Sequence, residues 1–214
     1  MTKVGVVLSG CGMYDGSEIH EAILTIFFLD RAGAEVTCMA PDIRQVEVVD
    51  HVTGKPTGEE RDVLLEAARI ARGSIRDIAQ VRASDLDALI LPGGLGASKN
   101  LCDFAIRGAD CTVNPEVERL IKEMHKARKP MGFICIAPVI AGKVLRAKVT
   151  IGTDKGVAAT IEKMGGKHIV CAVDEIAVDE EKKVVSTPAY MLGPTISRIA
   201  LGIERLVGKV LELA

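Results

Sequence analysis

The chain has 214 residues, 48% of them hydrophobic, and its 27 basic and 29 acidic side chains leave a formal net charge of −2. This length and apolar content suit one domain with a full core and exclude large-scale disorder. The balanced charge and the 3% aromatic content give no sign of a surface for nucleic acid or an anionic membrane. No uncharged segment reaches the roughly 20 residues of a membrane-spanning helix, and no signal-peptide pattern is recognised. We therefore expect a cytoplasmic protein without nucleic-acid or membrane partners.

Short apolar runs alternate with amphipathic segments, which predicts that strands alternate with helices. The expected strands are residues 3–9, 35–39, 87–91, 131–134, 148–152 and 167–171, followed by a hairpin over 175–178 and 183–186. The expected helices are 15–31, 116–127, 138–145, 155–164 and a long closing helix over 192–213. This order is typical of an α/β three-layer sandwich, in which a mostly parallel sheet has helices on both faces. We expect a single domain over residues 1–214.

Residues 43–82 form a polar and less regular part of the chain. They fit a small hairpin, over 46–51 with a turn near Gly54, and then a helix over 59–72. We interpret them as an insertion beside the edge of the sheet that carries the site. In open α/β sheets that edge is the one where the strands have their carboxyl ends.

The six cysteines, at positions 11, 38, 102, 111, 135 and 171, show neither C-x-x-C nor zinc-ligand spacing, so no metal site is predicted. Cys135 differs from the others because it follows one predicted strand and precedes a helix that starts at Pro138. This is the position of a nucleophile elbow, and amides at a helix N-terminus lower a thiol pKa. The residues leave two interpretations open, a reactive thiolate and a plain buried cysteine. Cys11 follows the first strand and could lie at the same edge.

A second strand ends in Pro92-Gly93-Gly94, where two glycines let the backbone turn sharply and present an amide. The amide of Gly94 could join that of Ile136 in an oxyanion hole, and an ordinary strand-to-loop turn is the alternative. Residues 10–16 lack the G-x-G-x-x-G spacing of a dinucleotide loop, so no cofactor is expected.

The first helix carries two acidic residues with different explanations. Asp15 suits its N-cap, with Glu18 at the third position of the helix. Glu21 instead shares an apolar stripe with Leu24 and Phe28. A carboxyl placed there is costly unless it is protonated or paired, and burial raises its pKa. Glu21 is therefore either an acid–base group near the thiol or a solvated helix residue. Its neighbour His20 could also lie near the site, although a surface histidine is the simpler interpretation.

Several of these motifs resemble one superfamily. Glu21, Leu91-Pro92-Gly93-Gly94 and Phe133-Ile134-Cys135-Ile136-Ala137-Pro138 look like the PfpI-like branch of the class I glutamine-amidotransferase-like fold. Four further segments, residues 8–12, 14–21, 150–154 and 187–192, resemble the ElbB family within that branch. The resemblance runs nearly from end to end. It implies a flavodoxin-like sandwich, often dimeric, and a glyoxalase associated with isoprenoid biosynthesis.

The family pattern, carried over residue by residue, assigns roles to the candidates. It places the nucleophile at Cys135, its carboxyl partner at Glu21 rather than Glu18, and the oxyanion amides at Gly94 and Ile136. Possible site-lining residues are Cys11, Tyr14, His20 and Asp154.

One family element is missing from the sequence. Many superfamily members carry a His about 20 residues after the nucleophile, where this chain has a strand ending in Gly152. The His-x-Glu pair of the amidotransferases is also absent, which argues against glutamine hydrolysis.

The resemblance implies a homodimeric glyoxalase without metal or cofactor, which converts glyoxal or methylglyoxal to a 2-hydroxy acid through a hemithioacetal on Cys135. The alternative is a redox-sensing or regulatory protein with little turnover, which the missing His favours.

Overall fold

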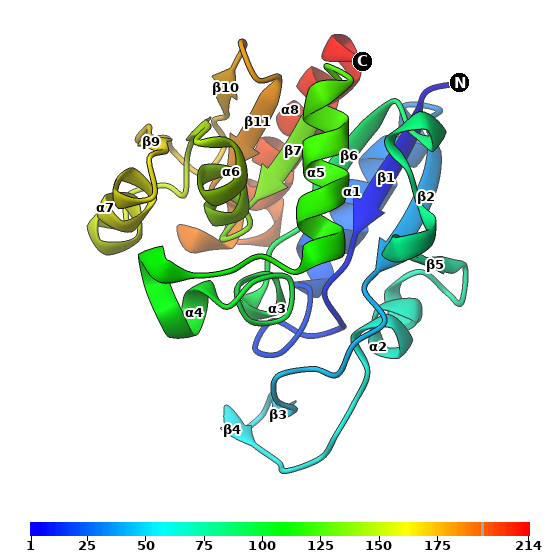
Figure 1. Ribbon diagram of the computed structural model, residues 1–214, viewed down its shortest axis with the longest axis vertical. Helices are drawn as coiled ribbons and strands as arrows, with labels where there is room; N and C mark the ends of the chain where they lie inside the picture. The colour runs from blue at the N-terminus through cyan, green and yellow to red at the C-terminus, as the bar shows by residue number, and fades with distance from the viewer. Residues whose placement is uncertain (194) are drawn as a thin grey trace.

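The computed structural model describes residues 1–193 and 195–214. Its centre is a seven-stranded sheet with the order β10-β11-β7-β6-β1-β2-β5, shown in Figure 1. The parallel strands are β1 (Lys3–Val7), β2 (Glu35–Ala40), β5 (Ile75–Asp77), β6 (Ala88–Leu91), β7 (Met131–Ile134) and β11 (Val184–Thr187). The edge strand β10 (Ala177–Asp179) runs antiparallel to β11. The α/β sandwich with a mostly parallel sheet is thus confirmed.

Helices cover both faces of this sheet, with α5 in front and α1 and α8 behind in the view of Figure 1. The helices are α1 (Ile19–Arg31), α2 (Val63–Ile70), α3 (Leu95–Lys99), α4 (Phe104–Arg107), α5 (Pro115–Lys126), α6 (Pro138–Leu145), α7 (Lys155–Lys163) and α8 (Ile196–Leu213). Short 3-10 turns are η1 (Ile78–Gln80), η2 (Ala83–Asp85), η3 (Gly108–Asp110) and η4 (Ala189–Met191). Because both faces are covered, β6 and β7 are buried at every position and read as continuous apolar runs. In the described part of the chain, no helix combines the length and apolar character that a membrane span requires.

Two expected helices begin later along the chain in the structure. The first helix begins at Ile19 rather than at residue 15, because Gly10 and Gly12 adopt positive φ angles and residues 10–18 form a loop. The closing helix begins at Ile196, where the side chain of Thr195 caps it by accepting from the amide of Arg198. Residue 194, which the expected helix included, lies outside the described residues.

The expected strands 148–152 and 167–171 shrink to two residues each, β8 (Lys148–Val149) and β9 (Lys167–His168). They pair with each other outside the central sheet. The reason is that β11 takes the place beside β7, with Thr187 opposite Ile134. No position next to β7 is left for β8.

Residues 43–82 contain the expected hairpin as β3 (Val49–Asp50) and β4 (Lys55–Pro56), followed by α2. Their last part also forms β5, which pairs in parallel with β2 and becomes an edge strand of the central sheet. Because Ile75-Arg76-Asp77 is short and half polar, β5 was not predicted from the sequence.

The contact between β7 and α8 depends on a glycine. A Cβ atom at Gly132 would lie 2.8 Å from Leu206 Cδ2 and 3.2 Å from Val210 Cγ2, both on α8. We expect Gly132→Ala to lower the free energy of unfolding by about 1–3 kcal/mol, because an overpacked core forces its neighbours apart. The measurement is urea unfolding at equilibrium. Gly208→Ala is the matched control, since a Cβ there meets nothing within 4 Å, and we expect a gain of up to about 1 kcal/mol from helix propensity.

Candidate functional site

Cys135 occupies the sharp turn between β7 and α6. Its φ of 62° is uncommon for a residue with a side chain, and such conformations cluster at active sites. The turn is held because the Cys135 amide donates to the carbonyl of Thr187 at 3.0 Å. The residue is 7% exposed and lines a pocket of about 660 Å³. The strand-to-helix geometry expected from the sequence is therefore present.

Three groups surround the Cys135 sulfur. The backbone amides of Gly94 and Ile136 donate hydrogen bonds to it, and the Glu21 carboxyl forms a hydrogen bond with the thiol. The structure thus brings together the four residues that the sequence analysis grouped as nucleophile, carboxyl partner and oxyanion donors. Such a cluster can hold a negative charge on sulfur, or on an oxygen bound near it.

Glu21 is completely buried, and both of its carboxyl oxygens accept backbone hydrogen bonds. Oε2 accepts from the amide of Gly93 at 3.0 Å, and Oε1 accepts from the amide of Tyr190 at 3.2 Å. Burial raises the pKa of Glu21 to about 8, the charge of Glu18 adds to this effect, and the hydrogen bonds oppose it. Glu21 is therefore mostly protonated at neutral pH, and its proton is available to the sulfur.

The pKa of the Cys135 thiol is raised well above its ordinary value, and the expectation that the start of α6 would lower it is wrong. Burial is the main cause, and the charge of Glu21 adds to it, whereas the amides of Gly94 and Ile136 act in the opposite direction. The thiol and the carboxyl therefore lose protons as a coupled pair. The carboxyl loses its proton before the thiol does, and its negative charge then opposes ionisation of the sulfur.

The glycines of residues 93–96 allow the start of α1 to approach the elbow. A Cβ at Gly93 would collide with Cys135 Cβ and lie 2.7 Å from Glu21 Oε2. Gly94 has a φ of 93°, and a Cβ there would collide with the amide of Glu18. That amide donates to the Gly93 carbonyl at 2.9 Å. Side chains at these positions would separate the carboxyl from the thiol.

Glu18, rather than Asp15, is the N-cap of α1, and its side chain accepts from the amide of Glu21 at 2.8 Å. The buried Asp15 accepts instead from the amide of Val49 at 2.8 Å. The expected cap was misplaced because the glycine-rich loop extends three residues further than the helix pattern suggests. Glu18 still has the capping role that the sequence analysis gave it.

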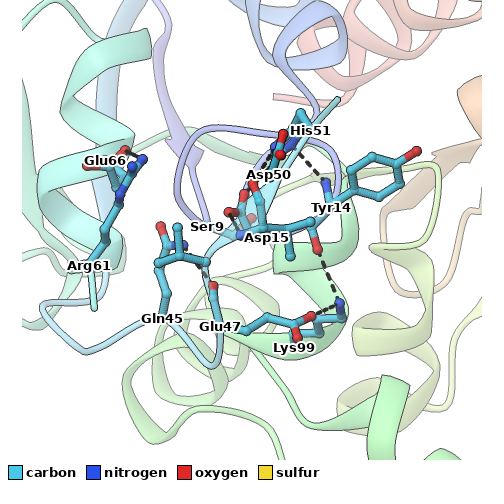
Figure 2. A network of polar contacts seen from close by, with 12 residues as sticks. Ser9, Tyr14, Asp15, Gln45, Glu47, Asp50, His51, Arg61, Glu66 and Lys99 are labelled. Carbon is cyan, nitrogen blue, oxygen red and sulfur yellow. Dashed lines mark hydrogen bonds and ion pairs between the residues drawn. The ribbon is translucent and has the colours of Figure 1, made fainter. Parts of the chain in front are cut away.

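Figure 2 shows how the loop before α1 is fastened to the rest of the chain. The amide of Tyr14 donates to His51 Nε2 at 3.2 Å, and the ring of His51 donates from Nδ1 to the carbonyl of Val49 at 2.9 Å. Lys99 donates to the Tyr14 carbonyl at 3.2 Å and also pairs with Glu47. Residues 43–82 therefore contribute two side chains, Glu47 and His51, that hold one wall of the pocket in place.

Of the four residues expected to line the site, Tyr14 and His20 do so and Cys11 and Asp154 do not. Asp154 caps α7, accepting from the amides of Gly156 and Val157. Cys11 packs against the core, and burial, followed by the charge of Glu66, raises the pKa of its thiol. The other lining residues are mainly apolar: Met13, Leu95, Ile136 and Met191.

Tyr190 is a lining residue that the sequence analysis did not single out. It follows β11 in the turn η4, where Ala189 has a φ of 42°, and its amide holds Glu21. Two signals in the sequence point to it: its place two residues after Pro188, at the end of a predicted strand, and the family resemblance of residues 187–192.

The place of the missing superfamily His is closed. Gly152 has a φ of 87°, and a Cβ there would lie 2.7 Å from Leu192 Cγ. An imidazole attached at residue 152 would therefore have to displace Leu192. Among residues 1–193 and 195–214, no group of three or more His, Cys, Asp and Glu side chains could hold a metal ion.

The sequence matches the DJ-1/PfpI family over residues 11–189. The fold and the elbow cysteine thus have their counterpart in a known class, and the chain belongs to the DJ-1/PfpI family of the class I glutamine amidotransferase-like superfamily. The human "Glutamine amidotransferase-like class 1 domain-containing protein 3, mitochondrial" is 52% identical over 222 residues, which cover 99% of this chain and 83% of the relative. The zebrafish (Danio rerio) "ES1 protein, mitochondrial" is 37% identical and covers 89% of this chain and 77% of the relative.

Among solved structures, an isoprenoid biosynthesis protein with an amidotransferase-like domain from Ehrlichia chaffeensis has a TM-score of 0.94 and 37% identity. The match covers 100% of this chain and 99% of that one. Drosophila melanogaster DJ-1beta, at 19% identity and a TM-score of 0.57 over 100% of this chain and 95% of its own, shares the fold.

These comparisons correct one expectation. The absence of a signal pattern suggested a cytoplasmic protein, but the human, rat and zebrafish relatives are all named mitochondrial proteins. The cytoplasmic assignment is therefore wrong.

The buried carboxyl makes stability depend on pH. Because the Glu21 pKa rises from 4.5 to about 8 on folding, the native state binds the more protons between these values. Its stability therefore falls as the pH rises through this window. We expect the wild-type free energy of unfolding to drop by several kcal/mol, since each tenfold difference in proton affinity is worth about 1.4 kcal/mol.

Glu21→Gln removes this ionisation, so the difference in stability between variant and wild type should change with pH in the same window. Gln has only one acceptor oxygen for two backbone amides, so the variant starts from a lower stability at acidic pH. Urea unfolding at a series of pH values measures the slope, and parallel curves for the two proteins would contradict a buried neutral carboxyl.

Proposed function

We propose that the protein is a cofactor-free glyoxalase of the ElbB type that converts small 2-oxoaldehydes, such as glyoxal and methylglyoxal, to 2-hydroxy acids. The observation that carries this proposal is the Cys135 sulfur, set between a buried carboxyl with a pKa of about 8 and two amide donors at a pocket. The ElbB assignment and the link to isoprenoid metabolism are supported by the sequence resemblance and by the Ehrlichia chaffeensis structure at 37% identity.

The reaction begins when the sulfur adds to the aldehyde carbon, C1, and the thiol proton passes to the oxygen on C1. The product is a hemithioacetal, and the amides of Gly94 and Ile136 stabilise the developing negative charge on that oxygen. No electron acceptor is needed, because C1 is oxidised in the later steps while the neighbouring carbon, C2, is reduced.

Glu21 as carboxylate then removes the proton on C1 and returns it to C2 through an enediol, which leaves a thioester on Cys135. Water hydrolyses the thioester, frees the thiol and releases the 2-hydroxy acid. A carboxyl with a pKa near 8 suits both the removal and the return of a proton, since general acid–base catalysis is most efficient when the pKa lies near the working pH.

The first test is replacement of the two reacting groups. We expect Cys135→Ala to abolish the formation of glycolate from glyoxal, because alanine has no thiol to bind the aldehyde carbon covalently. Glu21→Gln should lower kcat by about 10²–10⁴-fold, since it removes the proton carrier. Glu18→Gln is the matched control and should have a much smaller effect, because its amide oxygen can still cap α1. Full activity in Cys135→Ala, or a larger loss of kcat in Glu18→Gln than in Glu21→Gln, would contradict the assignment of Cys135 and Glu21 as the reacting groups.

A redox-sensing or regulatory role is the second candidate. It is favoured by the closure of the superfamily His position by Gly152 and Leu192, which leaves the thiol without that imidazole. In such a protein Cys135 would be oxidised in place of turning over a substrate, with a peroxide supplying the oxygen and accepting the electrons.

Glu21→Gln separates the two candidates at a pH above about 8, where wild-type Glu21 is ionised and its charge and hydrogen bond raise the pKa of Cys135. The thiolate fraction rises, so iodoacetamide and hydrogen peroxide should modify Cys135 faster than in the wild type. A glyoxalase forms glycolate as the wild type and loses this turnover in the variant, whereas a sensor forms no glycolate in either protein and shows only the gain in reactivity. Mass spectrometry of briefly treated protein and a glycolate assay on the same samples provide both readouts. Slower alkylation in the variant would show that the carboxyl assists thiol ionisation.

We also propose that the protein is a homodimer, as the resemblance implies. The exposed side chains of Ile19, Ile23 and Phe27 recur along one face of α1 and give that face an apolar stripe. Sedimentation equilibrium tests the oligomeric state.

A further inference from the structure

Tyr190 is connected to both sides of the candidate site. Its backbone amide donates to Glu21 Oε1 at 3.2 Å, and its side-chain hydroxyl is 2.8 Å from His20 Nδ1. Both His20 and Tyr190 line the same pocket as Cys135. One residue therefore fixes the position of the buried carboxyl and of an imidazole at the same time. The strained backbone of Ala189, with a φ of 42°, is what places Tyr190 in this turn.

His20 precedes Glu21 on α1, but its surroundings differ. Its side chain is 53% exposed, whereas Glu21 is completely buried. Glu18 Oε1 is 4.0 Å from His20 Nδ1, and the ring of Tyr190 lies 5.9 Å from the imidazole ring. Because Nδ1 is engaged by Tyr190, Nε2 is the ring nitrogen available to an oxygen atom in the pocket.

We propose that His20, oriented by Tyr190, carries the oxygen-bound protons of the substrate, in place of the imidazole that residue 152 does not supply. This inference rests on the proposed glyoxalase function and adds a second proton carrier to it. Glu21 moves the proton between the two carbons, and His20 moves a proton between the two oxygens.

The protons balance without a further reactant. When Glu21 removes the C1 proton, the oxygen on C2 becomes negative, and the His20 imidazolium gives it the proton from Nε2. When Glu21 returns its proton to C2, the neutral imidazole takes the proton of the C1 hydroxyl, and the C1 carbonyl of the thioester forms. His20 ends as the imidazolium from which it started.

The hydrogen bond between His20 and Tyr190 suits this cycle of proton transfers. Nδ1–H can donate to the Tyr190 hydroxyl in both states of the ring, so that only Nε2 changes its protonation. Burial and the charges of Glu18 and Glu21 raise the pKa of the Tyr190 hydroxyl, which keeps it neutral and able to accept. Glu18 is the other titratable group close to the ring, with Oε1 4.0 Å from His20 Nδ1.

The test compares His20→Ala with the wild type and with His125→Ala, a half-buried histidine on α5 outside the pocket. Glyoxal is the substrate and glycolate is the product measured. Protection of Cys135 by glyoxal against iodoacetamide reports hemithioacetal formation separately. Imidazole is added to each protein, since a small base can enter the space that the missing ring leaves.

For His20→Ala we expect kcat to fall by about 10²-fold, protection of Cys135 to stay unchanged and imidazole to restore part of the turnover. His125→Ala should behave as wild type. Tyr190→Phe keeps the amide on Glu21 and loses the hydroxyl, so its kcat should also fall.

A kcat for His20→Ala equal to that of the wild type, or a loss that imidazole does not restore, overturns the role of His20. An unchanged kcat in Tyr190→Phe would show that the Tyr190 hydroxyl is not needed for the role of His20. If the wild type forms no glycolate, the proposed function itself fails and this role fails with it. If the wild type does form glycolate, an unchanged kcat in His20→Ala, or a loss that imidazole does not restore, overturns the role of His20 and leaves the proposed function in place.

Discussion

The hydrogen bonds that enclose the Glu21 carboxyl are the constraint on which the site depends. Its two oxygens accept from the amides of Gly93, after β6, and Tyr190, after β11. The sheet order places β6, β7 and β11 next to one another, so their carboxyl ends deliver the two amides and the Cys135 elbow to one point. A buried carboxyl satisfied on both oxygens can remain in the core as a neutral acid without an unpaired polar atom.

This arrangement also explains the glycines around the site. Gly93 lies against both Cys135 and Glu21, and Gly94 lies against the backbone where α1 begins. The helix can approach only because these positions have no side chains, and Glu18 then caps its N-terminus. Backbone contact thus fixes the distance between carboxyl and sulfur more firmly than side-chain packing could.

Much of the central sheet and the position of the Cys135 elbow could be predicted from the sequence, because β6 and β7 are continuous apolar runs and the elbow follows β7. The apolar stripe that Glu21 shares with Phe28 made it a candidate, and the family resemblance then assigned it the role of carboxyl partner. The features that could not be predicted depend on contacts between residues far apart along the chain. β5 becomes a strand only by pairing with β2, and Tyr190 reaches the site through the turn after β11. The pKa of Cys135 is set by burial beside Glu21, which a helix N-terminus read from sequence does not reveal.

Glu21 and His20, the two proposed proton carriers, differ in how deeply they are buried. The chemistry of the protons that they carry explains this difference. A proton taken from carbon must return to the neighbouring carbon, so its carrier is best kept from water, which would exchange it. Glu21 is completely buried and meets this condition. Protons on oxygen exchange rapidly with solvent in any case, so the half-exposed His20 loses nothing by lying at the pocket wall. An imidazole on α1 can therefore serve where Gly152 and Leu192 have closed the opposite position.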